Sequence, residues 1–318
     1  MSDHPILQHQ NVLVTGGHGF IGRHVVAALA EAGAHPISAT HPAGTVLADI
    51  AGESLAVDLE DGDRVADAVE GIHSVIHLAA RAGGIQFQQE GAADVFASNR
   101  RITDNLLAAC AEAKVNRIFL ASSLVTYRPS SKPLAESHPQ LGPADRPSPY
   151  AWSKITDEVV ASWHQEVEVM VGRFGNVYGP GAPFDPDHST VVHALIDRAA
   201  RLDDGEDLVV WGDGSAVRSF VYVRDAARGV LIALTSGVSG EAYNIDSAVP
   251  VTIAQLAAVV RDQVNPSLNL SFDPSKPAGA PYRIASIDKL ADVGYTPDVS
   301  LEEGVKRTVE WYRENISA

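Results

Sequence analysis

A glycine-rich loop near the amino terminus constrains the fold of this chain more than any other feature. A β-branched run ends at Thr15, and three glycines follow with the spacing Gly16-x-x-Gly19-x-x-Gly22. The apolar-periodic segment Phe20–Leu29 then begins, so the order predicts a strand, a tight turn and a helix. The three glycines allow, in order, a turn, close approach of backbone to a pyrophosphate, and close helix–strand packing. The loop therefore predicts dinucleotide binding at the helix N-terminus.

Strand-like and helical segments alternate through the first half of the chain. The expected strands are Val12–Thr15, Leu55–Val57, Ser74–Leu78, Arg117–Ala121 and Glu168–Arg173, and a further strand ends at Thr40. The expected helices lie near residues 20–32, 62–70, 95–113 and 151–165. This alternation predicts an α/β fold with a Rossmann-type, doubly wound parallel sheet.

The pattern changes after about residue 176. Gly-, Pro- and Asp-rich turns there separate a strand near 207–211 from helices near 190–202, 252–263 and 301–314. We expect a dinucleotide-binding domain over 1–175 and a smaller substrate-binding lobe over 176–318, with parts near 215–245 returning to the first domain. The segment Tyr127–Pro149 holds six prolines and predicts a long surface loop beside the site.

Composition limits the partners. The net charge of −16 repels nucleic acid and anionic membrane surfaces, so an anionic ligand must be held by local donors. The single cysteine, Cys110, excludes an internal disulfide and favours a reducing compartment and a role in the core. With no run of about 18 apolar residues, we expect a cytoplasmic enzyme. We expect no metal site.

Two downstream motifs carry the chemistry. The strand that begins at Arg117 leads into Ser122-Ser123, at the carboxyl edge where parallel sheets bind ligands. Tyr150-x-x-x-Lys154 places a phenol and an ammonium on one face of a predicted helix. A nearby ammonium stabilises a phenolate and is expected to lower the pKa of Tyr150, and Ser123 can hydrogen-bond the same substrate oxygen. Ser123, Tyr150 and Lys154 are therefore predicted to form a proton relay for alcohol–ketone interconversion.

The whole chain resembles the extended short-chain dehydrogenase/reductases of the nucleotide-sugar epimerase/dehydratase family. The matching motifs are Thr15-Gly-Gly-His-Gly-Phe-Ile-Gly22, His77-Leu-Ala-Ala80, Asn99, Ser122-Ser123 with Tyr127 four residues beyond, Tyr150-x-x-x-Lys154, Asn176-Val-Tyr-Gly-Pro180, Trp211-Gly-Asp-Gly214 and Arg218-Ser-Phe-Val-Tyr-Val. Within the family, Arg81-Ala-Gly-Gly-Ile85 and the Trp211 motif resemble GDP-mannose 3,5-epimerase and GDP-fucose synthase.

The resemblance implies roles for individual residues. Asp58 would contact the adenine, and Asn99 would fix the nicotinamide-side structure. The substrate diphosphate or ribose would be held by Asn176, Arg218 and Arg283, with Trp211 as a further substrate contact. The implied coenzyme contacts are Gly16, Gly19, Phe20, Ile21, Gly22, Thr40, Asp58, Leu59, Ala79, Ala80, Asn99, Tyr150 and Lys154. The resemblance also implies a homodimer through helices 95–113 and 151–165.

Departures from the family pattern limit the reactions and coenzymes that we expect. Thr40 occupies the position at the end of the second strand where NAD-preferring relatives carry an acidic residue. Its neighbour His41 can assist a phosphate when protonated, so NADP(H) is slightly favoured over NAD(H). Leu124 and Val125 follow Ser123 where dehydratases carry proton-shuttling acids, which disfavours dehydration. Val125 also lies where 3,5-epimerases use a cysteine, which counts against epimerisation at C3 and C5; His188 is the candidate for the second acid/base of such a reaction.

Of the reactions that this family catalyses, hydride transfer at C4 of a nucleotide-diphosphate hexose agrees best with these residues. The leading hypothesis is an NADPH-dependent 4-keto reductase. A 4-epimerase that retains NAD uses the same residues and is the first alternative. A dinucleotide-sensing module without catalysis is the second alternative, although an intact relay counts against it because a sensor has no need of one.

Overall fold

The computed structural model describes residues 6–81, 91–185, 189–276 and 279–316. Its larger lobe is built on a seven-stranded sheet in which every adjacent pair of strands is parallel. The strand order is β11-β6-β5-β4-β1-β2-β3. The strands are β1 (Asn11–Thr15), β2 (His35–Thr40), β3 (Glu53–Ala56), β4 (Ser74–His77), β5 (Arg117–Ser123), β6 (Glu168–Phe174) and β11 (Ala242–Ile245). The predicted Rossmann-type parallel sheet is confirmed.

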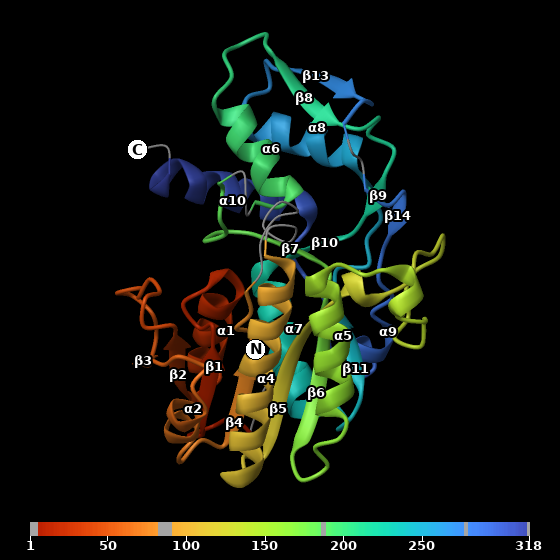
Figure 1. Cartoon of the computed structure of the whole chain (residues 1–318). Coiled ribbons are helices and arrows are strands. Elements are labelled where there is room, and N and C mark those ends of the chain that lie inside the picture. Colours follow the sequence, from red (N-terminus) through yellow and green to blue (C-terminus); the bar gives the residue numbers. More distant parts are fainter. Residues whose placement is uncertain (1–5, 82–90, 186–188, 277–278, 317–318) are drawn as a thin grey trace.

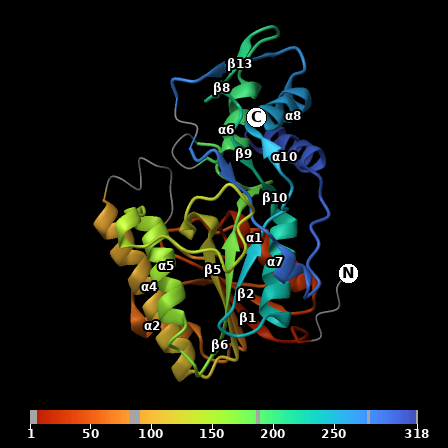
Figure 2. The same ribbon diagram turned by 90° about the vertical axis from the view of Figure 1, so that its right-hand side faces the viewer.

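Helices cover both faces of this sheet (Figures 1 and 2). One face carries α2 (Gly62–Ala68), α4 (Ala92–Glu112) and α5 (Pro149–Ala161), and the other carries α1 (Phe20–Glu31) and α7 (Val223–Ser236). Each layer buries its own apolar cluster against the sheet, as the near-continuous apolarity of the central strands requires. Cys110 lies in the cluster under α4, and burial raises its pKa to about 12, consistent with a packing role.

A smaller lobe lies beyond the carboxyl ends of the strands (Figure 1). The core of this lobe is a separate apolar cluster. It joins α6 (Val191–Ala200), α8 (Ile253–Val264) and α10 (Leu301–Asn315) to the parallel pair β8 (Asp207–Trp211) and β13 (Asn269–Asp273). Between the lobes, β7 (Asn176–Tyr178) pairs with β10 (Phe220–Tyr222). Beside them, β9 (Val217–Arg218) lies between β12 (Val251–Thr252) and β14 (Tyr282–Arg283).

Residues 223–245 form α7 and β11 and therefore belong to the larger lobe, as does the short α9 (Asp288–Ala291), which packs beside β11. No helix of the described ranges is long and apolar enough to cross a membrane.

Several element boundaries differ from those expected. β3 begins at Glu53, because pairing with β2 starts at Ile37↔Glu53. β5 continues through Ser123, because its pairing with β6 extends to the residue after Ser122. α5 begins at Pro149, in the first turn where a missing N–H costs nothing, with Ser148 accepting a 3.2 Å hydrogen bond from Ala151 N as the cap.

The proline-rich segment contains only the short 3₁₀ turn η2 (Pro143–Asp145), and a similar turn, η1 (Leu124–Thr126), precedes it. It is not wholly a surface loop. Tyr127 and Leu134 are buried within it, and Leu134 forms a bridge to Ala285 near the carboxyl-terminal end of the chain. Both side chains belong to a small apolar cluster with Leu124 and Ala285, which packs this part of the loop into the protein.

Candidate active site

The glycine loop has the geometry that its sequence predicts. Gly16 has φ +68°, in the left-handed region that favours glycine, and links β1 to the turn before α1. A methyl group built on Gly22 would overlap the carbonyl oxygen of Gly16, so close packing there needs glycine. Gly19 is the N-cap of α1 and supplies no side chain, which leaves the N–H groups of the first turn open to a ligand.

A cavity of about 550 Å³ opens beside this loop, along the carboxyl ends of β2, β3 and β4. Seven of the residues predicted to contact the coenzyme line it: Gly16, Gly19, Thr40, Asp58, Leu59, Ala79 and Ala80. Phe20, Ile21 and Gly22 are the first residues of α1 and do not line it. The other lining residues are Ala39, His41, Val57, Glu60, Arg81, Ser98 and Ile102. The cavity has the place and lining that the adenosine half of a dinucleotide requires.

His18, inside the glycine loop, belongs to this region and was not singled out from the sequence. It is buried, and its Nδ1 accepts a 3.0 Å hydrogen bond from Leu47 N, so Nε2 carries the proton of the neutral ring. Nε2 has no partner among the described residues. Burial, aided by the charge of Arg23, lowers the pKa of His18. A buried N–H donor without a partner fits a site that receives a coenzyme oxygen.

The predicted relay residues come from two elements in contact. Ser123 ends β5 and caps η1, its Oγ accepting a 3.3 Å bond from Val125 N. Helix α5 packs against β5 and η1, with Tyr150 in its first turn. Lys154 lies one turn further on, with 3% of its surface exposed. The structure thus packs the helix that carries Tyr150 against the two elements that meet at Ser123.

The electrostatics of Tyr150 differ from the expectation. Burial, together with the charge of Asp157, raises the pKa of Tyr150 to about 12, whereas an effect of Lys154 was expected to lower it. The ammonium is matched by the Asp157 carboxylate, whose Oδ2 lies 3.7 Å from Lys154 Nζ. In the ligand-free protein Tyr150 is therefore protonated at neutral pH and able to donate a proton.

Asn99 joins the coenzyme side of the site to α5. Its side chain is buried, accepts a 2.7 Å bond from Arg81 N and donates to Arg81 O at 3.1 Å. It also donates to Ser153 Oγ at 3.5 Å, and Ser153 donates to the carbonyl of Tyr150 at 2.9 Å. These bonds hold the chain after β4 against the turn that carries Tyr150, in agreement with a structural role on the nicotinamide side.

Nearby, His77 in β4 is satisfied as a core histidine. Its Nδ1 lies 2.7 Å from Thr15 Oγ1, and its Nε2 lies 3.4 Å from Thr103 Oγ1. Burial and the charge of Lys154 lower its pKa to about 3, so the ring is neutral.

Three of the four predicted substrate contacts lie close together between the lobes. Arg218 and Arg283 are direct register partners on β9 and β14. Asn176 donates a 2.8 Å bond to the carbonyl of Ser219, the residue after Arg218. Burial lowers the pKa of both arginines, and for Arg218 the neighbouring charge of Arg283 adds to the effect. Two half-buried guanidinium groups side by side suit an anion such as a diphosphate.

Trp211 is not brought into this group by any described contact. It is 53% exposed on β8, and its described ring contacts are Arg198 and Lys276, each 6.0 Å from the ring centroid. His188 and the residues 82–85 of the Arg81 motif lie outside the described residues. Within the described ranges no cluster of three metal-ligating side chains occurs.

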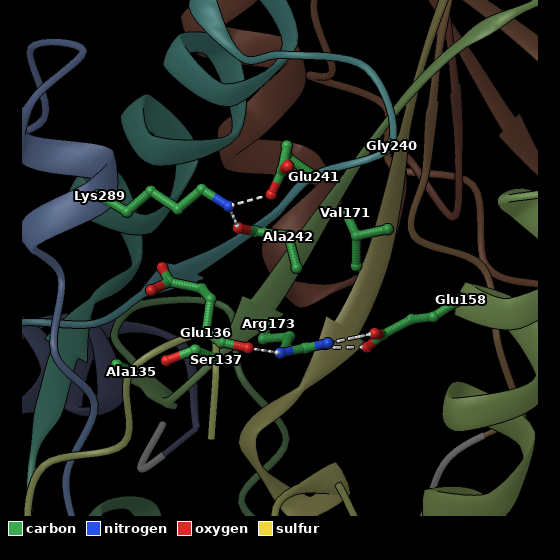
Figure 3. Close-up of a pocket in the computed structure, with 10 residues that line it drawn as sticks. All are labelled: Ala135, Glu136, Ser137, Glu158, Val171, Arg173, Gly240, Glu241, Ala242 and Lys289. Atoms are coloured by element: carbon green, nitrogen blue, oxygen red, sulfur yellow. Dashed lines mark hydrogen bonds and ion pairs between the residues drawn. The ribbon is translucent and has the colours of Figure 1, made fainter. Parts of the chain in front are cut away.

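A second cavity, of about 450 Å³, lies beside β6 and β11 (Figure 3). Four of its five charged side chains form two ion pairs. Arg173 donates to Glu158 through Nε and Nη2, the shortest distance being 2.6 Å, and Lys289 binds Glu241 at 2.5 Å. The fifth, Glu136, accepts a 2.7 Å hydrogen bond from Asn244 N. Glu158 also accepts a hydrogen bond from Ser122, next to Ser123. This cavity borders a network that anchors α5 to the sheet.

Comparison with known proteins identifies the family. Residues 12–246 match the model described as "Epimerase: NAD dependent epimerase/dehydratase family". The chain is 33% identical to a dTDP-4-dehydro-6-deoxy-D-allose reductase of Streptomyces sp, over 96% of each chain. It is also 33% identical to GDP-L-fucose synthase 1 of Arabidopsis thaliana, over 76% of this chain and 77% of that one.

Among solved structures, the UDP-glucose 4-epimerase of Thermus thermophilus in complex with NAD is 27% identical, with a TM-score of 0.82 over 96% of this chain and 100% of that chain. The relatives thus include nucleotide-sugar 4-keto reductases and epimerases, and the family uses nicotinamide coenzymes. The resemblance inferred from the motifs is confirmed, and the chain belongs to the NAD-dependent epimerase/dehydratase family.

Proposed function

We propose that this protein is an NADPH-dependent reductase of the C4 ketone of a nucleotide-diphosphate hexose. The observation that carries the proposal is the protonated Tyr150 in the first turn of a helix that packs against β5 and η1, the two elements that meet at Ser123, in the lobe that also bears the coenzyme cavity. The Streptomyces relative, which matches nearly the whole chain, is named for reduction of a 4-dehydro nucleotide sugar. The paired arginines supply the local cations that a diphosphate needs on a chain of net charge −16.

Each relay residue has a task at the ketone. The bound coenzyme supplies the hydride that adds to C4. Tyr150 donates its proton to the oxygen on C4 as charge develops there, and Ser123 holds that oxygen by a hydrogen bond. Lys154 stabilises the phenolate left on Tyr150. The residues after Ser123, Leu124 and Val125, carry no group that could move a proton at C3 or C5, so the chemistry stays at one carbon.

We propose NADP(H) as the coenzyme. Thr40 at the end of β2 carries no charge to repel a 2′-phosphate, and His41 beside it is an exposed imidazole 4.0 Å from Asp58. His18 adds an unpartnered N–H donor in the adjoining glycine loop. The test measures oxidation of NADPH and NADH with several 4-keto nucleotide sugars, and a higher kcat/KM with NADH would refute the coenzyme assignment.

The 4-epimerase remains the second candidate, because the solved Thermus relative with NAD is a UDP-glucose 4-epimerase. The purified protein separates the two. A reductase consumes one NADPH for each sugar reduced and is isolated without a fixed coenzyme. A tightly retained coenzyme with no net NADPH consumption, together with interconversion of C4 epimers, would establish the epimerase instead.

Arg283 provides a test of the substrate site. We expect Arg283→Gln to raise the KM for the nucleotide sugar about tenfold or more and to leave kcat within about threefold, because the lost charge-assisted bonds reach a remote diphosphate. Steady-state kinetics measure both constants. The matched control is Arg201→Gln, which removes an exposed arginine paired with Asp197 on α6. Equal KM values in the two variants would remove Arg283 from the substrate site.

We also infer that the enzyme works in the cytoplasm as a homodimer through α4 and α5. Its single, buried Cys110 suits a reducing compartment. Val159 near the end of α5 and Trp163 just beyond it are exposed apolar side chains four residues apart, which a second copy could cover. The molecular mass of the purified protein in solution tests the dimer. The mass of a monomer at micromolar concentration would contradict it.

A further inference from the structure

A buried carboxylate that the relay does not use lies directly beneath it. Asp157 is on α5, one turn beyond Lys154, and is 1% exposed. Its Oδ1 accepts a 2.6 Å bond from Arg100 Nη1 on the neighbouring helix α4, which runs alongside α5 (Figures 1 and 2). Its Oδ2 lies 3.7 Å from Lys154 Nζ and has no hydrogen-bond partner among the described residues. The Asp157 carboxylate thus lies between two cations, with Arg100 closer to it than Lys154.

The charged surroundings of this carboxylate are few. From α4 it faces Arg100, which also binds the exposed Asp104, and Thr103. From β4 the neutral His77 lies near Lys154 and bonds Thr103. On α5 itself, Glu158 is turned to the opposite side, toward Arg173 and Ser122.

The unequal distances determine what Asp157 can do. Arg100 is bound within hydrogen-bond distance and serves as a fixed counter-ion. The Lys154 ammonium lies just beyond that distance from Asp157. It is therefore attracted to the carboxylate, while its N–H groups stay available to other hydrogen-bond acceptors. A purely structural ion pair in a buried site would satisfy both oxygens, because an unpartnered buried oxygen is costly.

We propose that Asp157, held by Arg100, is a positioning residue that tethers the Lys154 ammonium below Tyr150 and keeps the phenol in its protonated, donor form. The proposal rests on the proposed reductase function, in which Tyr150 must donate rather than accept a proton. The negative charge opposes formation of a phenolate on Tyr150, which agrees with the raised pKa of that group. Lys154 stays beside the carboxylate, and the N–H donors that it does not give to Asp157 can stabilise the phenolate as it forms.

The test is a spectrophotometric titration of tyrosine ionisation in the ligand-free protein. We titrate the wild type and Asp157→Asn, and we titrate each of them again with Tyr150→Phe added. The difference between the curves with and without Tyr150→Phe is the titration of Tyr150 alone among the eight tyrosines. Removing the charge of Asp157, which raises the pKa of Tyr150, should lower the pH at which Tyr150 titrates by about one unit. The matched control is Asp104→Asn, which removes the other carboxylate on Arg100 but does not face Lys154, and should leave the titration unchanged.

A second variant protects the test against unfolding. Asp157→Asn leaves Lys154 as a buried cation without a carboxylate and leaves Arg100 with only the exposed Asp104, whereas Asp157→Asn with Arg100→Gln removes the Arg100–Asp157 pair together and should retain the fold. It should shift the Tyr150 titration in the same direction. An unshifted titration in both folded variants, or an equal shift in Asp104→Asn, overturns the proposal. A shifted titration in an enzyme that reduces no 4-keto sugar would refute the proposed function and leave the role of Asp157 intact.

Discussion

Replacing Tyr150 by Phe should lower kcat for ketone reduction about a thousandfold. The phenol is the proposed proton donor to the oxygen on C4, and a positioned general acid contributes on the order of 10²–10⁴ in rate. Because the benzyl group remains in place, we expect the dissociation constant of NADPH to stay within about twofold. Single-turnover kinetics and coenzyme fluorescence titration measure the two quantities separately.

The matched control for this variant is Tyr312→Phe. Tyr312 lies on α10 in the smaller lobe, and its hydroxyl donates a 2.8 Å bond to Asp197. Removing that hydroxyl should cost stability of about 1 kcal/mol and leave kcat unchanged. If Tyr150→Phe retained wild-type turnover, another group would be the proton donor and the relay assigned here would be incorrect.

Replacing Glu158 by Ala should lower the free energy of unfolding by about 3–5 kcal/mol. The carboxylate is the buried partner of Arg173, and its loss leaves an uncompensated guanidinium inside the protein. It also accepts hydrogen bonds from Ser122 and Gln140, so the variant releases α5 from the end of β5. Denaturant unfolding at neutral pH measures the change.

Two further variants test whether the loss of stability comes from the buried ion pair. Glu168→Ala removes an exposed partner of Arg117 and should cost less than about 1 kcal/mol. Glu158→Ala with Arg173→Met removes both buried charges and should be more stable than Glu158→Ala alone. Equal losses from Glu158→Ala and Glu168→Ala would show that the buried pair does not anchor α5.

Local sequence was sufficient for much of the fold and part of the site. The glycine loop, the strand ending at Ser123 and the helix bearing Tyr150 depend on short-range signals, namely backbone freedom, hydrophobic period and the Ser148–Pro149 helix start. Their meeting point follows from the topology of a parallel sheet, whose carboxyl ends share one edge. The roles of Gly16 and Gly22 were predictable for the same reason.

Long-range charge arrangement was not predictable in this way. Arg100 and Asp157 are 57 residues apart, and nothing in either segment indicates that α4 and α5 place them together. The expected lowering of the Tyr150 pKa was wrong because burial of the phenol raises that pKa, and the charge of Asp157 adds to the effect; the spacing of Tyr150 and Lys154 alone reveals neither. His18 was overlooked because its burial depends on Leu47, in the loop after β2.

Deuterium transfer tests the central claim most directly. The enzyme is incubated with NADPH deuterated at the transferable position of the nicotinamide and with a 4-keto nucleotide sugar, and the product is analysed by mass spectrometry and NMR. We predict one deuterium at C4 of the sugar for each coenzyme oxidised, and loss of this transfer in Tyr150→Phe. Product without deuterium at C4, or sugar conversion without coenzyme oxidation, would contradict C4 ketone reduction by this protein.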